Sequence, residues 1–346
     1  MSQTATPRTG MSRRQVLAGA SALPLLGIVP RRADEAEFSY KAATGQDPSH
    51  PVNTRAQEAI DRIRAATNIR LGIRLFPANR LGSDTDLLCQ VRSGAVEFFI
   101  QASSVQPTLV PAVAIGSTGF AFNVYDEVWK AVDSSLGKYV RAQIEKVGLL
   151  TKARPSDQGF RQNAMYGKHT HGPEDLRGLK MSLPSAPMLA TLFTSLGVSP
   201  TPINFNEVYS ALQTKLVEGQ ESPLAIISTA REHEVQKYCT LVNHIWDRCW
   251  ILGSRKAVER LPKDIQHIVY RESDRAAGGA RRYAGAAQVV ARRPAGQGLA
   301  HHRRRPQGVQ VRAGQDYLLG PARQVRRGCL EAVGRAHVRA GLNRLR

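Results

Sequence analysis

The chain has 346 residues, a net charge of +20 and 42% hydrophobic residues. This length allows two domains with separate cores, and the composition is that of an ordinary globular protein rather than a fibrous or membrane-embedded one. The charge is unevenly placed, because the 77 residues 270–346 hold 17 arginines and four acids, or 13 of the 20 net charges. The overall charge therefore does not by itself indicate a nucleic-acid-binding protein.

The N-terminus has the pattern of an export signal. An arginine pair at 13–14 precedes an apolar run at 16–29, which is shorter than the ~20 residues of a membrane-spanning helix. The stretch "SRRQVL" is similar to a twin-arginine export signal. A buried helix is the alternative, but Pro24 and Pro30 would break it. We expect residues 1–33 to be removed and the mature protein to be periplasmic.

The first half of the mature chain alternates strand and helix patterns. A helix capped by Asn53 or Thr54 and another capped by Ser83 and ended by Gly94 are expected. Strands are expected at 38–44, 69–76 and 96–102, and one long or broken helix at 123–148.

The second half repeats this alternation. The expected strands are 160–166, 179–184, 240–246 and 250–254, and the expected helices are 186–197, 204–220 and 234–238. Strands separated by helices indicate mostly parallel sheets joined by crossover helices. We therefore predict an α/β protein with two lobes and a cleft between them, with lobe I at 34–157, lobe II at 158–248 and a return toward lobe I at 249–269.

The sequence carries few signs of catalysis. No G-x-S-x-G, H-E-x-x-H, P-loop or G-x-G-x-x-G motif is present. Cys249 with His244 is an alternative nucleophile pair, although no oxyanion hole is indicated nearby. His169 and His171 would need further ligands to hold a metal. Export permits disulfides, and the four cysteines show no C-x-x-C spacing, so free buried thiols are expected, with a Cys239–Cys249 bridge left open.

One set of motifs is more specific. The stretches "NRLGSDTDLLCQVRSGAVEFF", "GFRQNAMY", "PEDLRGLKMSLPSAP", "TPINFNEVYSALQTKLVEGQESPLA" and "EVQKYCTLVNHIW" occur in this order. Together they closely resemble the DctP-type solute-binding proteins of TRAP transporters, over about residues 38–269. The resemblance implies a two-lobed periplasmic binding protein that closes on an organic-acid anion. It also implies delivery to a permease with small and large membrane subunits, with no catalysis, cofactor, metal or nucleic acid.

The resemblance also implies a binding site. It places Arg161 as the partner of the ligand carboxylate, a role that suits the planar, permanently charged guanidinium. It places Phe205 and Trp246 as walls of the cleft, although simple core packing would explain both. Asp84 is expected at the cleft edge in lobe I, with a helix N-terminal charge as the alternative.

The chain departs from the family pattern at several positions. Ser182 stands where relatives usually carry a second arginine, and Ser222 stands where they usually carry asparagine. Losing one guanidinium would weaken carboxylate binding by ~1–3 kcal/mol. Arg248 and Cys249 replace what are usually glycine and an aromatic residue. A different ligand and a non-functional, drifted copy both stay open.

The basic tail contains no Lys, Ile, Phe, Met, Trp or Thr from residue 270 onward. A nucleic-acid-binding tail usually mixes lysine and aromatic residues with arginine. The Arg, Gly, Ala and Pro content is instead typical of GC-rich DNA translated out of frame. We predict a frameshift near residues 269–274, after which the resemblance ends and the tail is not native-like.

Overall fold

The computed structural model describes residues 36–151, 154–291 and 318–320. The predicted export signal at 1–33 and most of the predicted tail lie outside the described residues. Within the described ranges, no helix combines the length and apolar character needed to cross a bilayer.

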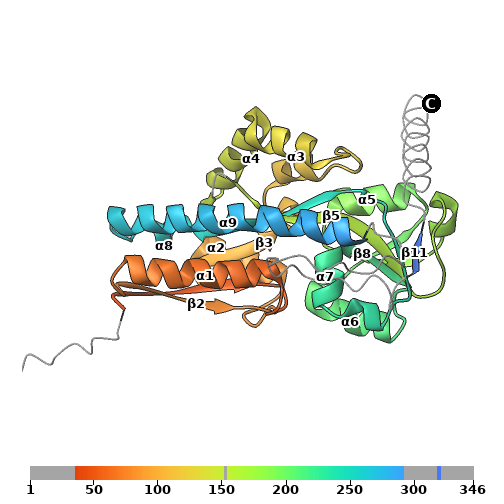
Figure 1. Cartoon of the computed structure of the whole chain (residues 1–346), viewed down its shortest axis with the longest axis horizontal. Helices are drawn as coiled ribbons and strands as arrows, with labels where there is room; N and C mark the ends of the chain where they lie inside the picture. The colour runs from red at the N-terminus through yellow and green to blue at the C-terminus, as the bar shows by residue number, and fades with distance from the viewer. Residues whose placement is uncertain (1–35, 152–153, 292–317, 321–346) are drawn as a thin grey trace, which may run out of the picture. The chain divides into compact units, whose positions relative to one another are not determined.

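The structure alternates strands and helices along most of the chain (Figure 1). The strands are β1 Phe38–Thr44, β2 Leu71–Phe76, β3 Phe98–Ala102, β4 Leu149–Thr151, β5 Ser156–Met165, β6 Lys180–Leu183, β7 Ser199–Pro202, β8 Gly219–Pro223, β9 Tyr238–Thr240, β10 Trp246–Ser254 and β11 Leu318–Gly320. The α-helices are α1 Pro51–Ala66, α2 Asp84–Ser93, α3 Tyr125–Asp133, α4 Ser135–Lys146, α5 Pro187–Ser195, α6 Phe205–Gln213, α7 Leu224–Thr229, α8 Arg255–Val258 and α9 Lys263–Ala291. Short 3₁₀ helices include η2 Pro111–Ser117 and η4 Glu232–Glu234.

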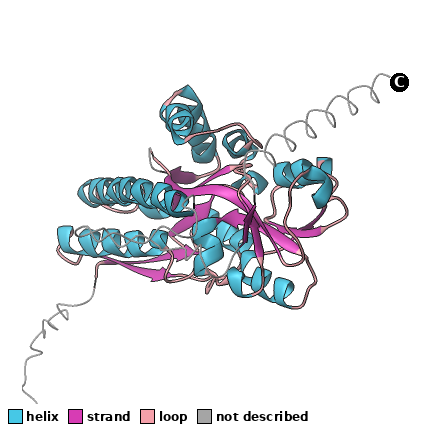
Figure 2. Ribbon diagram, turned by 45° about the vertical axis from the view of Figure 1, so that its right-hand side comes forward, coloured by secondary structure: helices cyan, strands magenta, loops and turns pink. Residues whose placement is uncertain are grey.

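The strands form one mixed sheet in the order β2-β1-β3-β10-β5-β8-β6-β7, with helices on its faces (Figure 2). Pairing is parallel at the two ends of this order, in β1–β2, β1–β3, β6–β7 and β6–β8. In the middle, β10 and β5 run antiparallel to each other and to their outer neighbours. The prediction of mostly parallel sheets is therefore wrong for the centre, because β10 returns from lobe II in the opposite direction.

The strands β5 and β10 belong to both lobes. Residues 156–160 of β5 pair with β10, and residues 161–165 pair with β8 of lobe II. Cys249 of β10 pairs with both Ala102 of β3 and Ser156 of β5. The predicted lobe boundaries at 157/158 and 248/249 thus fall inside two continuous strands, which connect the lobes without a flexible linker.

Each lobe has its own apolar core. In lobe I, Phe99, Ile144 and Trp250 belong to one buried cluster, and α1, β1 and α9 contribute to a second. In lobe II, Met181 and Phe193 belong to a third cluster around β6 and α5. These cores fix the strand ends that face the cleft.

Several local predictions are confirmed. Strand β1 has the predicted bounds, and α2 starts after a Ser83 capping box and ends at Gly94. Gly94 has φ +90°, in the left-handed region that favours glycine. The predicted helix at 123–148 is broken at Ser134, which ends α3 and caps α4.

Other local predictions are wrong. Helix α1 is capped by His50, whose Nδ1 accepts a hydrogen bond from the Val52 N–H, and not by Asn53 or Thr54. The expected helix at 204–220 ends at 213, and residues 219–223 form β8 instead. This strand is buried along its whole length, so it lacks the alternation that identifies a half-buried strand.

Helix α9 extends past the predicted start of the basic tail. It continues without interruption through residue 270, where we placed the start of a tail that is not native-like, and reaches Ala291. Its side chains contact the rest of the protein beyond that point, since Glu272 pairs with Arg62 of α1 and Ala277 is buried. The helix lies alongside α1 and also contacts β5 and α7 (Figure 1). Any change of frame at 269–274 would thus have to preserve a helix that packs on both lobes.

Replacing Ala277 with Asp tests this packing. Ala277 is 1% exposed, so the new carboxylate would be buried without a partner, and we expect the melting temperature to fall by about 5 °C or more. The matched control is Gly278→Asp, because residue 278 is exposed and a Cβ there has no neighbour within 4 Å. Equal melting temperatures for the two variants would contradict the packing of α9 described here.

Candidate functional site

A cleft lies where the two lobes face each other. It contains about 580 Å³ of empty space, some of it open to solvent. Lobe I contributes residues from the β1–α1 connection, α2 and β3, and lobe II contributes residues from β5, β6, α6 and β8. Both polar and apolar side chains line it, which is the usual composition of a small-molecule site.

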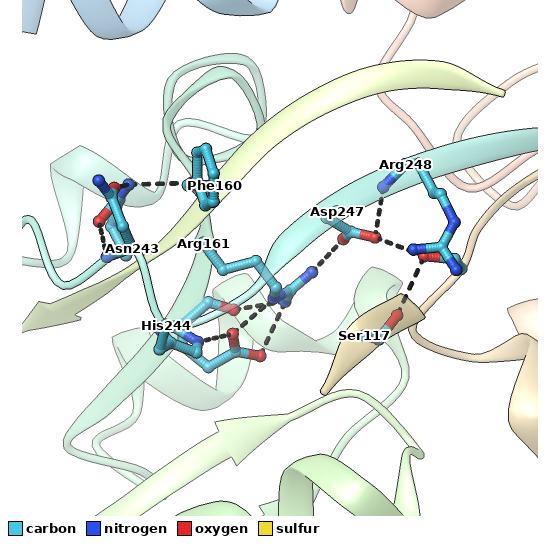
Figure 3. Close-up of polar contacts among 10 residues, drawn as sticks. Ser117, Phe160, Arg161, Asn243, His244, Asp247 and Arg248 are labelled. Atoms are coloured by element: carbon cyan, nitrogen blue, oxygen red, sulfur yellow. Dashed lines mark hydrogen bonds and ion pairs between the residues drawn. The ribbon is translucent and has the colours of Figure 1, made fainter. Parts of the chain in front are cut away.

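Arg161 is the central charged residue of the cleft. It lies in β5 at the point where this strand leaves β10 and pairs with β8. Its guanidinium is bound by two carboxylates, with Nε and Nη2 donating to Glu221 and Nη1 donating to Asp247 at 2.5 Å. Nη2 also donates to the Glu221 carbonyl oxygen at 2.6 Å. Figure 3 shows Asp247 between Arg161 and Arg248.

Glu221 and Asp247 anchor Arg161 to the rest of the protein. Glu221 Oε2 also lies 2.7 Å from His244 Nε2, and Asp247 Oδ1 accepts a hydrogen bond from Ser103 of lobe I. Burial opposes the ionisation of Glu221, but the Arg161 charge and the His244 contact outweigh it and lower the pKa of this carboxyl. The guanidinium is therefore oriented before any ligand arrives.

A third acid lies close to this group. Glu232 of η4 is 1% exposed, and its Oε2 has no hydrogen-bond partner among the described residues. Burial raises the pKa of Glu232 to about 8, although the Arg161 charge acts in the opposite direction. This carboxyl is thus mainly protonated at neutral pH, so the buried group gains no further negative charge from it.

The structure brings five of the six predicted site residues together. Asp84, Arg161, Ser182, Phe205 and Ser222 all line the cleft. Asp84 is the first residue of α2 and reaches the cleft from lobe I. Ser182 and Ser222 come from the neighbouring strands β6 and β8, and Phe205 begins α6.

Trp246 lies elsewhere, and its predicted place in the cleft wall is corrected. The side chain is 1% exposed and packs with Val132 and Phe160 in a separate core cluster. Its Nε1 donates to Asp157 at 2.7 Å, and its ring makes an edge contact with Trp129. The reason is strand geometry, because successive side chains of β10 point to opposite faces of the sheet and Asp247 takes the face toward Arg161.

Arg248, a departure from the family pattern, is part of the structural framework. It is 3% exposed, and its Nη1 and Nη2 donate to the carbonyl oxygens of Gly116 and Val113 in η2. Burial lowers the pKa of its guanidinium to about 10, and Asp247 acts against this shift. A Cβ at residue 116 would lie 2.4 Å from Nη2, so the arginine needs the glycine opposite it.

The alternative nucleophile pair is not assembled. Cys249 is fully buried and packs with Val52, Ala56 and Ile100 of lobe I, whereas His244 Nε2 lies against Glu221 of lobe II. Burial raises the pKa of the Cys249 thiol, which disfavours the reactive thiolate. Cys89, Cys239 and Cys249 are free thiols.

Several residues of the site were missed in the sequence. Gln220 and Glu221 stand in one of the family-like motifs without an assigned role, and Gln46 and Asp247 were given no role either. All four are buried polar residues in or beside strand segments. Polar residues in a run that is buried on both faces are a usable signal, since such groups need partners.

The fold and this site define a class of protein, a two-lobed binding protein with a charged cleft between the lobes. The chain matches the family model of the bacterial extracellular solute-binding proteins, family 7 (DctP), over residues 42–289. It therefore belongs to this family, and the match extends 20 residues beyond the expected limit of 269.

Individual proteins are also similar to this chain. An uncharacterized protein of Sinorhizobium fredii is 29% identical over 76% of this chain, and the match spans only 49% of that relative's length. The C4-dicarboxylate-binding periplasmic protein of Rhodobacter capsulatus is 28% identical, over 72% of this chain and 74% of its own.

Solved structures share the fold. A TRAP periplasmic solute-binding protein of Sulfurospirillum deleyianum with bound succinate superposes with a TM-score of 0.77 at 23% identity, over 88% of this chain and 94% of its own. One of a Polaromonas species bound to D-erythronate gives a TM-score of 0.77 at 20% identity, over 89% and 94% of the two chains. These likenesses establish the two-lobed architecture.

Removing the Arg161 charge is expected to destabilise the protein. In Arg161→Met, Glu221 and Asp247 would be left buried without their cation, so we expect the free energy of unfolding to fall by about 3–5 kcal/mol in urea titrations. The double variant Arg161→Met/Glu221→Gln should recover part of this loss. A cost below about 1 kcal/mol for the single variant would show that the two carboxylates do not depend on Arg161.

Glu232 gives a prediction for the dependence of stability on pH. Its pKa in the folded protein is about 8, above the ordinary value of 4.5. The protonated form is thus favoured by folding, and stability is lost as pH rises from about 4.5 to about 8. In Glu232→Gln this loss is absent, so its melting temperature relative to the unmodified protein should rise between about pH 5 and pH 8. A difference that does not vary with pH would contradict the assignment.

Proposed function

We propose that this chain is an exported solute-binding protein that captures an organic-acid anion in the cleft and delivers it to a TRAP-type permease with small and large membrane subunits. The observation that carries the proposal is Arg161, the one cation among the described residues that line the cleft. Two buried carboxylates hold its guanidinium in place. The residue lies in β5 where this strand passes from β10 to β8, at a junction common to both lobes. Membership of a periplasmic family supports export, which the predicted signal at 1–33 would direct.

The geometry suggests how binding and closure are coupled. Arg161 belongs to β5, and Asp247 connects it through Ser103 to β3 of lobe I. A ligand carboxylate beside the guanidinium would therefore act on a network that includes both lobes. Closure over Asp84 would then bury the anion, and reopening at the permease would release it.

A copy with altered specificity is the second candidate. Its support is the position of Ser182 and Ser222, which both line the cleft in places where the family resemblance implies larger polar groups. A Cys/His enzyme has no comparable support, because Cys249 and His244 do not form a pair. The proposed frameshift at residues 269–274 falls within α9, and most of the tail that would follow it lies outside the described ranges.

Thermal shift with a panel of mono- and dicarboxylates tests the proposal. We expect at least one acid to raise the melting temperature in a concentration-dependent way. Ser185→Glu should weaken its binding by about tenfold or more, because residue 185 lines the cleft and a carboxylate there would repel the anion.

The matched control is Ser210→Glu, which makes the same change at an exposed position of α6. This variant should bind the acid as the unmodified protein does. If no acid stabilises the folded protein, or if Ser185→Glu and Ser210→Glu respond alike, the proposed function or its site fails.

A further inference from the structure

The charges of the cleft limit the charge of its ligand. Among the described lining residues, the carboxyl groups of Asp84 and Glu221 face one cation, Arg161. An arginine has five N–H donors, and four of these are used by Glu221 and Asp247. One Nη1 hydrogen is left, which suffices for one ligand carboxylate oxygen. A second ligand carboxylate would be desolvated beside Asp84 or Glu221 without a cation.

The neutral polar groups of the cleft include amide oxygens that have no hydrogen-bond donor within the described ranges, so a ligand that supplies donors would suit them. Gln236 Nε2 donates to the Ala164 carbonyl at 2.7 Å, which fixes Gln236 Oε1 as an acceptor. Gln220 Nε2 donates to that oxygen, so the orientation of the Gln220 amide is also fixed. Its Oε1 is left buried without a partner among the described residues, and Gln220 lines the cleft.

Lobe I offers further acceptors. Gln46 lines the cleft, is 7% exposed, and has a buried Oε1 without a partner in the described part of the chain. Asp84 Oδ1 and Asn79 Oδ1 lie 2.6 and 2.9 Å from the position of a Cβ at Gly45, so the missing side chain leaves room for both groups. Hydroxyl groups are the donors that an organic acid can bring to such oxygens.

The fold alone does not choose between ligand charges, because structures with bound succinate and with bound D-erythronate resemble this chain equally, each with a TM-score of 0.77. We propose that the cleft selects a singly charged carboxylic acid carrying hydroxyl groups and rejects dicarboxylates, with Asp84 and Gln220 accepting hydrogen bonds from the ligand hydroxyls. This inference rests on the proposed function.

Calorimetric titration with four classes of acid, matched in chain length, separates charge from hydroxyl content. The four-carbon set is D-erythronate, butyrate, succinate and tartrate, and the six-carbon set is gluconate, hexanoate, adipate and glucarate. At about pH 7.5 Asp84 is ionised, since burial raises its pKa only to about 6. In at least one set, we expect the hydroxylated monoacid to bind about tenfold or more tightly than each of the other three.

Two variants test the role of Asp84. Asp84→Asn keeps the shape and removes the negative charge, so the preference for the hydroxylated monoacid over the hydroxylated diacid should fall about fivefold or more. The control Asp86→Asn removes the same charge from the same turn of α2, where the side chain is exposed and lies outside the cleft lining. This control should leave the preference unchanged.

The outcomes distinguish this inference from the function on which it rests. Succinate or adipate binding as tightly as the matched hydroxylated monoacid would overturn the inference and leave the proposed function intact. An equal change of preference in Asp84→Asn and Asp86→Asn would also overturn it. If no acid in either set binds to protein with an unchanged circular dichroism spectrum, the proposed function itself fails.

Discussion

The structure depends on the ionic group of Arg161, Glu221 and Asp247. A buried guanidinium is costly unless its charge is matched and its N–H donors find acceptors. Here two carboxylates and a backbone carbonyl match the charge and accept four of the five N–H donors. The three residues come from β5, β8 and β10, so the same contacts hold the centre of the sheet together. Under the proposed function, Arg161 would be both a binding residue and a structural one, and its loss is expected to affect stability and affinity together.

The two carboxylates that stabilise Arg161 also reduce its attraction for an anion. Because Glu221 and Asp247 already neutralise Arg161, the cleft does not have a strong positive potential for an arriving anion. Affinity for the proposed anion would therefore come partly from neutral groups of the cleft lining, such as Gln46 and Gln220. Unpaired buried oxygens discriminate strongly between ligands, because a ligand without the matching donor leaves them unsatisfied.

The sequence predicted much of the fold and part of the site. Strand β1 and helix α2 follow directly from local patterns, because a capping serine and a left-handed glycine mark the ends of α2. Strand β8 was missed, since a fully buried strand of Gly219–Pro223 carries no alternation. Asp247 could not be found locally either, because its partners Ser103 and Arg161 are 144 and 86 residues away in the chain.

The prediction that Trp246 lines the cleft was wrong for a related reason. Whether a strand residue faces the cleft or the core depends on register, and a shift of one residue exchanges the two faces. The family pattern identified the correct segment of β10, and the register placed Asp247 rather than its neighbour toward Arg161.

The position of β10 in the sheet also determines when the protein can fold. This strand lies between β3 and β5, yet it ends at Ser254, roughly 90 to 150 residues after them in the chain. Until β10 leaves the ribosome, β3 and β5 each lack the strand that pairs with them at the centre of the sheet. Helix α9 is synthesised later still. Lobe I therefore cannot complete as an independent unit during synthesis, because the pairings of β10 with β3, β4 and β5 must form late, as a slow step that depends on non-local contacts.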